Sequence, residues 1–187
     1  MSRANRQHLR APVNQEMLYL CDDYVLKGRC SNISEGGMLI TDMGRVPTST
    51  RFHTMVSLIQ YPEFSKLSSQ KLISIDHSAF EIEVIRCEVD IVRSFDGLSE
   101  VEKILLPSIG AKFSHVSSGN MALIRSYVTT FSKNMIYLLT QFENSSKKNG
   151  NIVHLRKTAS LLGYDSQIKL PLLRAKVLHD YQSLESL

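Results

Sequence analysis

Two arginines near the N-terminus have the type and spacing needed to bind an anionic nucleotide. Arg6 and Arg10 lie four residues apart, just before the segment Ala11-Pro12-Val13. A guanidinium is planar, permanently charged and donates two parallel hydrogen bonds, so it pairs with phosphate oxygens, stacks on a purine, and can pair with the O6 and N7 edge of guanine. The pair therefore predicts a contact with phosphate or guanine. A solvated charge pair in a basic arm is the alternative.

A second motif, Asn32-Ile33-Ser34-Glu35-Gly36-Gly37, complements the arginines. Asn32 offers an amide donor and a carbonyl acceptor to a base edge, and Ser34 offers a small hydroxyl. Gly36 and Gly37 let the backbone approach a ligand closely or adopt a positive φ. The spacing alone is also typical of a β-turn. Together the two motifs predict a site for a small, doubly charged guanine nucleotide.

The segment between residues 15 and 117 must position these motifs, and its hydrophobic pattern is strand-like. Apolar residues alternate in short runs separated by turn residues, as expected for half-buried strands. A change of phase near Val84 and Ile85 predicts a bulge or the meeting of two strands. Residues 95–103 form a polar excursion. We predict strands at residues 17–21, 24–30, 37–41, 51–60, 71–94 and 110–116.

After the last strand the hydrophobic period changes from two to about 3.6, which predicts a long amphipathic helix from Ser117 or Ser118, as N-cap, to about Phe142. A polar linker at 144–151 precedes two shorter helices, one at 152–162 that Gly163 stops and one at 171–184. The last helix carries an apolar stripe that packs on its own chain or docks another molecule. The stripe consists of Leu173, Val177, Tyr181 and Leu184.

Composition indicates a globular protein that can bury a core. Of 187 residues, 43% are hydrophobic and 21% are charged. No apolar stretch reaches the roughly 18 residues of a membrane span, and no apolar run follows the basic start, so we expect a cytoplasmic protein without a signal peptide. Cys21, Cys30 and Cys87 show no CxxC or CxH spacing, so we expect reduced, mostly buried thiols and no metal site.

Charge is distributed unevenly along the chain. Residues 1–15 hold three arginines and no acid, residues 16–146 hold 12 basic and 15 acidic side chains, and residues 147–187 hold 7 and 3. Basic ends can attract nucleic acid, an acidic protein surface or a small anion, or they can simply be solvated. Because aromatic residues make up only 7%, Trp is absent and the body is acidic, we do not expect a nucleic-acid-binding protein.

The sequence does not predict an enzyme. The six histidines show no HxxxH or HxE pairing, and neither a GxSxG nor a GxxxxGK[ST] motif is present. Glu81, Glu83, Glu88 and Asp90 occupy alternate positions, as on the solvated face of a strand, and His115 is interpreted in the same way. We therefore assign no catalytic residue, metal or cofactor.

The order of these features resembles the PilZ domain of bacteria. RxxxR stands before the first strand, and NxSxxG follows about 22 residues after Arg10. A valine-arginine element at 91–93, a Gly-x-x-Phe strand at 110–113 and a closing helix complete a resemblance that covers about residues 3–130. The resemblance implies a mainly β fold, a six-stranded antiparallel β-barrel followed by the long amphipathic helix, with a small C-terminal helical extension.

The resemblance also implies a function, namely binding of the bacterial second messenger cyclic di-GMP. Arg6 and Arg10 would grip phosphates and stack on or pair with guanine, while Asn32, Ser34 and Gly37 would hold a guanine and a neighbouring phosphate. We expect a basic arm (1–14) that the ligand orders, the PilZ-like body (15–145) and a helical extension (146–187) that associates with a protein partner or with itself. The alternatives are a PilZ-like docking module without ligand and a basic nucleic-acid-binding barrel.

Overall fold

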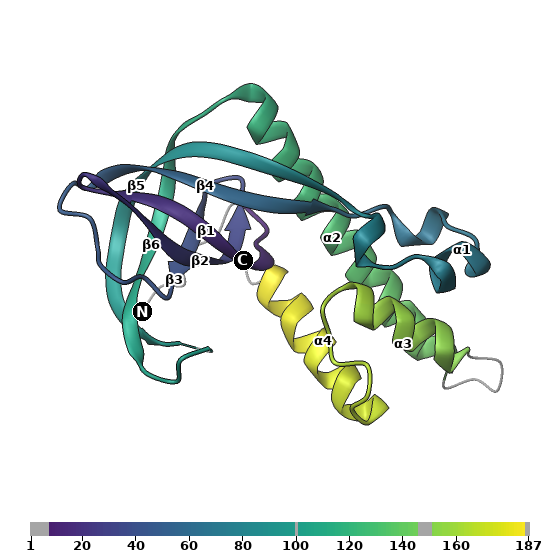
Figure 1. The fold of residues 1–187 in the computed structure, drawn as a ribbon. Coiled ribbons are helices and arrows are strands. Elements are labelled where there is room, and N and C mark those ends of the chain that lie inside the picture. The colour runs from purple at the N-terminus through teal and green to yellow at the C-terminus, as the bar shows by residue number, and fades with distance from the viewer. Residues whose placement is uncertain (1–7, 100, 146–150, 186–187) are drawn as a thin grey trace. The chain divides into compact units, whose positions relative to one another are not determined.

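The computed structural model describes residues 8–99, 101–145 and 151–185, with six strands followed by helices (Figure 1). Hydrogen-bonded neighbours follow the order β1-β2-β3-β6-β5-β4, and β1 also pairs with β4, so the sheet closes on itself. This confirms the predicted mainly β architecture with a six-stranded antiparallel sheet and helices after it. The strands are β1 (Ala11–Cys21), β2 (Tyr24–Ser34), β3 (Gly37–Thr41), β4 (Arg51–Gln60), β5 (Glu81–Leu98) and β6 (Leu105–Val116).

The chain divides into two compact units. The first consists of residues 7–59 and 82–128, which contain most of the sheet and the start of helix α2 (Ser118–Ser145). Among the described residues, the second consists of 60–81, 129–145 and 151–185. Helix α2 therefore contributes residues to both units, and the helical unit includes more of the chain than the predicted extension at 146–187.

The β1–β2 hairpin is longer than predicted. Its pairing runs from Cys21↔Tyr24 at the turn to Ala11↔Ile33 at the open end, with a register shift between Pro12 and Gln15. Asn14 lies within that shift and has φ 51°, a left-handed conformation that asparagine tolerates better than most residues. The bulge keeps both strands paired up to the second motif, whereas alternation alone indicated shorter strands.

The core of the first unit follows the alternation of the strands. Met17, Tyr19 and Cys21 of β1 are almost fully buried, and the Tyr19 hydroxyl donates to the Arg45 carbonyl at 2.8 Å. Helix α2 begins as predicted, because the Ser117 hydroxyl accepts a hydrogen bond from the Asn120 amide at 3.2 Å. Its residues Ile124, Tyr127 and Val128 are buried.

The prediction of strand structure, bulged or in two strands, over 71–94 is wrong in its first part. Residues 64–79 form two short 3-10 turns, η1 (Phe64–Lys66) and η2 (His77–Ala79), around helix α1 (Ser69–Ser74). Ser68 caps α1 by accepting from the Lys71 amide. A helix of six residues is too short to show a 3.6-residue period, and its apolar residues resembled strand alternation.

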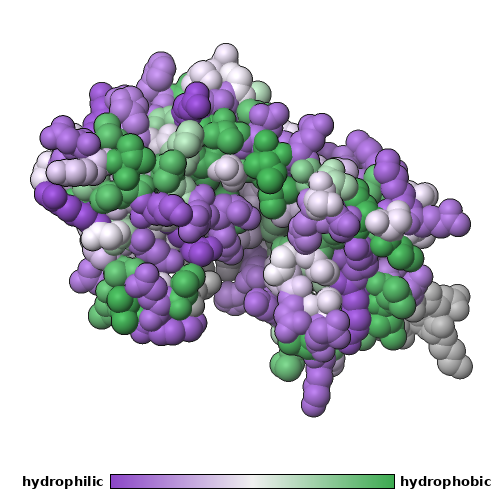
Figure 2. Space-filling view, viewed as in Figure 1, coloured by the Kyte–Doolittle hydropathy of each residue, from purple (hydrophilic) through white to green (hydrophobic). Residues whose placement is uncertain are grey.

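Strand β5 also differs from its prediction. It continues to Leu98, into the expected polar excursion, because it pairs with β6 as far as Leu98↔Leu105. Its pairing with β6 begins at Cys87 and has register shifts at 88/89 and 91/93, so this pairing does not reach the predicted irregularity near residues 84 and 85. Strand β6 starts at Leu105, five residues before the predicted start. In Figure 2, green patches lie over this hairpin. Its apolar residues at least 40% exposed, with the connecting turn included, are Ile82, Val84, Val92, Phe95, Leu98, Val101, Ile104 and Leu105.

The second unit is organised around a buried amide on α2. Asn134 is fully buried, accepts from the Phe64 amide at 2.8 Å and donates to the Pro62 carbonyl at 2.9 Å. The Tyr61 ring packs edge-on against Phe80 and Phe131, with centroids 5.4 and 5.9 Å apart. These contacts hold the 60–81 segment to the second half of α2.

The two C-terminal helices match their prediction. Helix α3 (Ile152–Leu161) ends before Gly163, which has φ 85°, and α4 (Leu170–Glu185) carries Pro171 in its first turn. Arg174 of α4 pairs with Glu143 of α2 at 2.6 Å. Three residues of the apolar stripe of α4, Leu173, Val177 and Leu184, are buried within the chain, and Tyr181 is half-buried. Packing on its own chain therefore accounts for most of the stripe.

Two further expectations concern thiols and membrane spans. Cys21, Cys30 and Cys87 are free and buried, as predicted, and burial raises the pKa of Cys87 to about 11. Within the described ranges, none of the helices combines the length and apolar character that crossing a membrane requires.

Candidate functional site

The second motif forms the connection between β2 and β3. Ser34 pairs with Gly37 across the turn Glu35-Gly36, and the Ser34 hydroxyl donates to the Gly37 carbonyl at 3.2 Å. The turn is held to β6 by a hydrogen bond from the Phe113 amide to the Gly36 carbonyl at 3.2 Å. Ser34 is only 5% exposed, so its side chain is buried beneath the surface and does not project into solvent.

Packing alone requires a glycine at position 37. A Cβ on this residue would lie 2.0 Å from the Ala111 carbonyl oxygen and 2.9 Å from the Lys112 Cα. Both atoms belong to the backbone of β6, so they cannot move aside as a flexible side chain would. The close approach of β3 to β6 therefore explains this glycine without reference to a ligand.

Asn32 is half-exposed near the open end of the β1–β2 hairpin. It pairs with Pro12 on β1 and with Leu39 on β3. Its side-chain amide has no hydrogen-bond partner among the described residues, whereas the side chains of Ser34 and Glu35 in the same motif are both hydrogen-bonded. Its donor and acceptor are thus available to an incoming base edge.

The structure brings the arm to the second motif. The His8 ring lies 3.1 Å from the position that a Cβ on Gly36 would occupy. Ala11 pairs with Ile33, and continuing this antiparallel register by one residue sets Arg10 level with Ser34. Arg10 is half-exposed, and Arg6 lies outside the described residues. Of the five predicted residues, Arg10, Asn32, Ser34 and Gly37 thus gather at one end of the sheet.

Helix α2 supports both parts of this region. The Tyr127 hydroxyl donates to the Pro12 carbonyl at 2.5 Å, next to the arm. Arg125 donates from Nε to Oε2 of Glu35 at 2.9 Å, and its Nη2 lies 2.8 Å from the same oxygen. One turn of helix therefore contacts the base of the arm and the turn of the second motif.

A further arginine shares the face of Asn32. The cross-strand pairs Asn32↔Leu39, Leu39↔Gly110 and Gly110↔Arg93 form one row across β2, β3, β6 and β5. Paired residues of an antiparallel sheet present their side chains on the same face. The Arg93 Nε lies 3.0 Å from the position of a Cβ on Gly110, and its Cζ lies 5.3 Å from the Phe95 ring centroid. Arg93 thus crosses β6 over a glycine, on the face that carries Asn32.

The Glu35 carboxyl is expected to titrate below its ordinary value of 4.5. The hydrogen bond from Arg125 is the main cause, desolvation opposes it, and the charges of Arg125 and His8 add to it. Because the folded-state pKa is depressed, the ion pair stabilises the fold fully above the unfolded-state pKa and ceases to do so as the pH falls through the folded-state pKa. NMR titration of the Glu35 carboxyl in the wild type and in Arg125→Gln measures this. A wild-type midpoint at or above 4.5 contradicts the expectation.

A family model of the PilZ domain matches residues 4–130 of this chain. The chain belongs to the PilZ domain family. Among solved structures, the Bacillus subtilis inhibitor of motility MotI/DgrA aligns with a TM-score of 0.46 and 13% identity, over 67% of this chain and 50% of that chain. The PilZ domain of YcgR from Escherichia coli with c-di-GMP aligns with a TM-score of 0.41 and 13% identity, over 77% and 99% of the two chains. No curated protein matches by sequence.

The PilZ match includes both motifs and ends two residues beyond the part of α2 that belongs to the first unit. Residues 131–187 lie outside the match. PilZ domains are signalling and receptor modules. Among the described residues, no group of three or more His, Cys, Asp or Glu side chains is arranged to hold a metal ion.

Sequence interpretation of the PilZ motifs missed two residues of this region. Glu35 occupies a variable position of NxSxxG and received no role from the motif. Arg125, 90 residues away, was predicted only to lie on a helix. The position of Glu35 inside the motif is a signal that reasoning could have used. No pattern in the sequence links it to Arg125, because their contact depends on how the helix packs.

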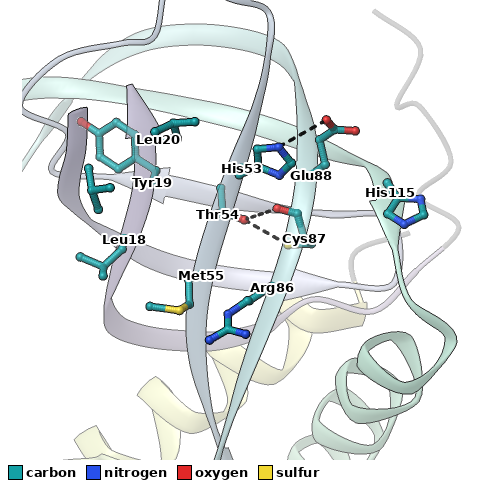
Figure 3. A pocket seen from close by; sticks show the side chains of 11 residues that line it. Leu18, Tyr19, Leu20, His53, Thr54, Met55, Arg86, Cys87, Glu88 and His115 are labelled. Carbon is teal, nitrogen blue, oxygen red and sulfur yellow. Dashed lines mark hydrogen bonds and ion pairs between the residues drawn. The ribbon is translucent and has the colours of Figure 1, made fainter. Parts of the chain in front are cut away.

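A pocket of about 580 Å³ lies on another wall of the PilZ sheet, across β1, β4 and β5 (Figure 3). The Thr54 hydroxyl lies 3.0 Å from the Cys87 Sγ at its base, and His53 points toward Glu88 at 3.9 Å. None of the predicted site residues lines this pocket. Its lining residues are Leu18, Tyr19, Leu20, Val25, His53, Thr54, Met55, Arg86, Cys87, Glu88 and His115.

Proposed function

We propose that this protein is a receptor for cyclic di-GMP and relays the messenger by fixing its basic arm against the sheet. The observation that carries the proposal is the placement of the arm. His8 lies against Gly36, and the β1–β2 register sets Arg10 level with Ser34. Family membership supports the choice of ligand.

The proposed roles follow from the chemistry of each side chain. Arg6 and Arg10 bind the phosphates and stack on or pair with a guanine, because a guanidinium matches both partners. Asn32 presents its amide to a guanine edge. Ser34 and the backbone of Gly37 lie next to the neighbouring phosphate. The ligand carries two negative charges, which the cationic arm neutralises.

Relay by the arm follows from this arrangement. A ligand shifts a conformational equilibrium only by its different affinity for the two states. Arm residues that bridge to the ligand favour the state in which the arm lies on the Ser34–Gly37 turn, and the surface so formed is the one a downstream protein recognises. We place this receptor in the cytoplasm, a reducing compartment that suits three free thiols.

Isothermal titration of cyclic di-GMP into the full chain tests the proposal, with GTP and GMP as controls. Saturable binding that neither control reproduces is the expected result. Absence of heat and of competition at high micromolar cyclic di-GMP would reject the receptor function and favour a PilZ module that only docks proteins. Binding of RNA or DNA that falls steeply with salt, without a response to cyclic di-GMP, would favour the nucleic-acid alternative.

A further inference from the structure

Glu35 places a negative charge inside the proposed ligand site. It stands between Ser34 and Gly36, and its side chain is 31% exposed. A ligand phosphate near Ser34 and Gly37 therefore approaches a carboxylate, and like charges at short range repel. Binding of the phosphate therefore requires a cation near Glu35 that offsets this repulsion.

Arg125 is the cation placed to supply it. Its side chain is 63% exposed, and its Nε and Nη2 both lie against one oxygen of Glu35. A guanidinium has five N–H donors, so this pairing leaves donors directed elsewhere. A phosphate is a more highly charged partner for a guanidinium than a partly exposed carboxylate, so it forms the stronger interaction.

Contacts other than the ion pair also place Arg125 and Glu35 next to the ligand motifs. Two residues further along α2, Tyr127 donates to the Pro12 carbonyl, and Pro12 pairs with Asn32. His8 of the arm lies over Gly36, the residue after Glu35. Arg125 thus stands on a helical turn that contacts the arm's base and the motif turn together.

We propose that Arg125 is a further ligand-binding residue of this site, which Glu35 holds in an ion pair until a phosphate of the ligand replaces the carboxylate. The inference rests on the proposed function. Glu35 is then an internal competitor of the ligand: it weakens binding by occupying Arg125 and by repelling phosphate. Exchange of the partner of Arg125 changes a contact between the motif turn and α2, so ligand binding is signalled to the helix.

A double-mutant cycle on cyclic di-GMP affinity tests the inference with Glu35→Gln, Arg125→Gln and the double variant. We expect Glu35→Gln to raise the affinity about threefold or more and Arg125→Gln to lower it about tenfold, a factor typical for one charge-assisted contact. In the Arg125→Gln background, the gain from Glu35→Gln should differ from the gain in the wild type, because Glu35 then only repels phosphate and no longer occupies a guanidinium. Arg125→Lys, which retains the charge, should recover part of the loss.

The chain offers a matched control in the ion pair between Arg45 and Asp22. Its N–O distance is 3.1 Å and its side-chain exposures are 59% and 25%, close to those of the Arg125 pair. It lies at the turn end of the β1–β2 hairpin, opposite to the site. Arg45→Gln should leave the affinity unchanged. The NMR signal of the Arg125 Nε–H provides a second readout and should shift on addition of ligand.

The outcomes separate this inference from the function on which it depends. Two results would overturn the role of Arg125 and leave the receptor function intact. One is that Arg125→Gln binds cyclic di-GMP with the wild-type affinity, and the other is that Glu35→Gln raises the affinity equally with and without Arg125. A wild-type protein that binds no cyclic di-GMP overturns both.

Discussion

Arg10→Ala will weaken cyclic di-GMP binding at least about tenfold. Continuation of the β1–β2 register sets Arg10 level with Ser34. If Arg10 binds the ligand as proposed, its loss removes a charge-assisted contact. Such contacts contribute about 1.5–3 kcal/mol, and about 1.4 kcal/mol corresponds to a factor of ten in affinity. Isothermal titration measures the effect, and Arg6→Ala should behave alike if both arginines act as proposed.

Arg86→Ala is the matched control for this prediction. Arg86 is an exposed arginine of β5 that lines the pocket on another wall, so its removal lowers the net charge by the same amount. If the two variants lose affinity equally, the arginines act only through net charge and Arg10 has no specific role. Because Arg10 also interacts within the chain, the melting temperature of each variant is measured alongside.

Gly37→Ala will destabilise the sheet by about 3 kcal/mol or more. The new Cβ would lie 2.0 Å from the Ala111 carbonyl oxygen, well inside any van der Waals contact, so β3 and β6 must separate. Relief of the clash breaks the pairing Gly37↔Lys112 and its neighbours, which also displaces the second motif. Urea unfolding monitored by circular dichroism measures the change in free energy of unfolding.

Gly44→Ala is the control for the packing argument. A Cβ at Gly44 meets no atom within 4 Å, and its backbone is outside the left-handed region. We expect its free energy of unfolding to stay within about 0.5 kcal/mol of the wild type. A Gly37→Ala protein that is as stable as the wild type would refute the packing role, and loss of cyclic di-GMP binding in that stable protein would assign Gly37 to the ligand alone.

Local signals in the sequence predicted most elements of the fold. Alternation located the strands, the change to a 3.6-residue period located α2, and the Ser117 cap, Gly163 and Pro171 marked helix ends. These signals depend on residues only a few positions apart, so they can be recognised in the sequence before the fold is known. The same reasoning failed for α1, which is too short to show a period, and for the length of β5.

The sequence by itself determined which side chains are suited to a dianionic guanine nucleotide and the order in which they occur, since residue type and spacing set that chemistry. Only the tertiary structure decided which of them meet. The bulge near Asn14 and the register of β1 with β2 set Arg10 level with Ser34, and the packing of α2 joined Arg125 to Glu35. Such contacts join residues far apart in the chain, and their partners are chosen by strand register and helix packing, which no local pattern encodes.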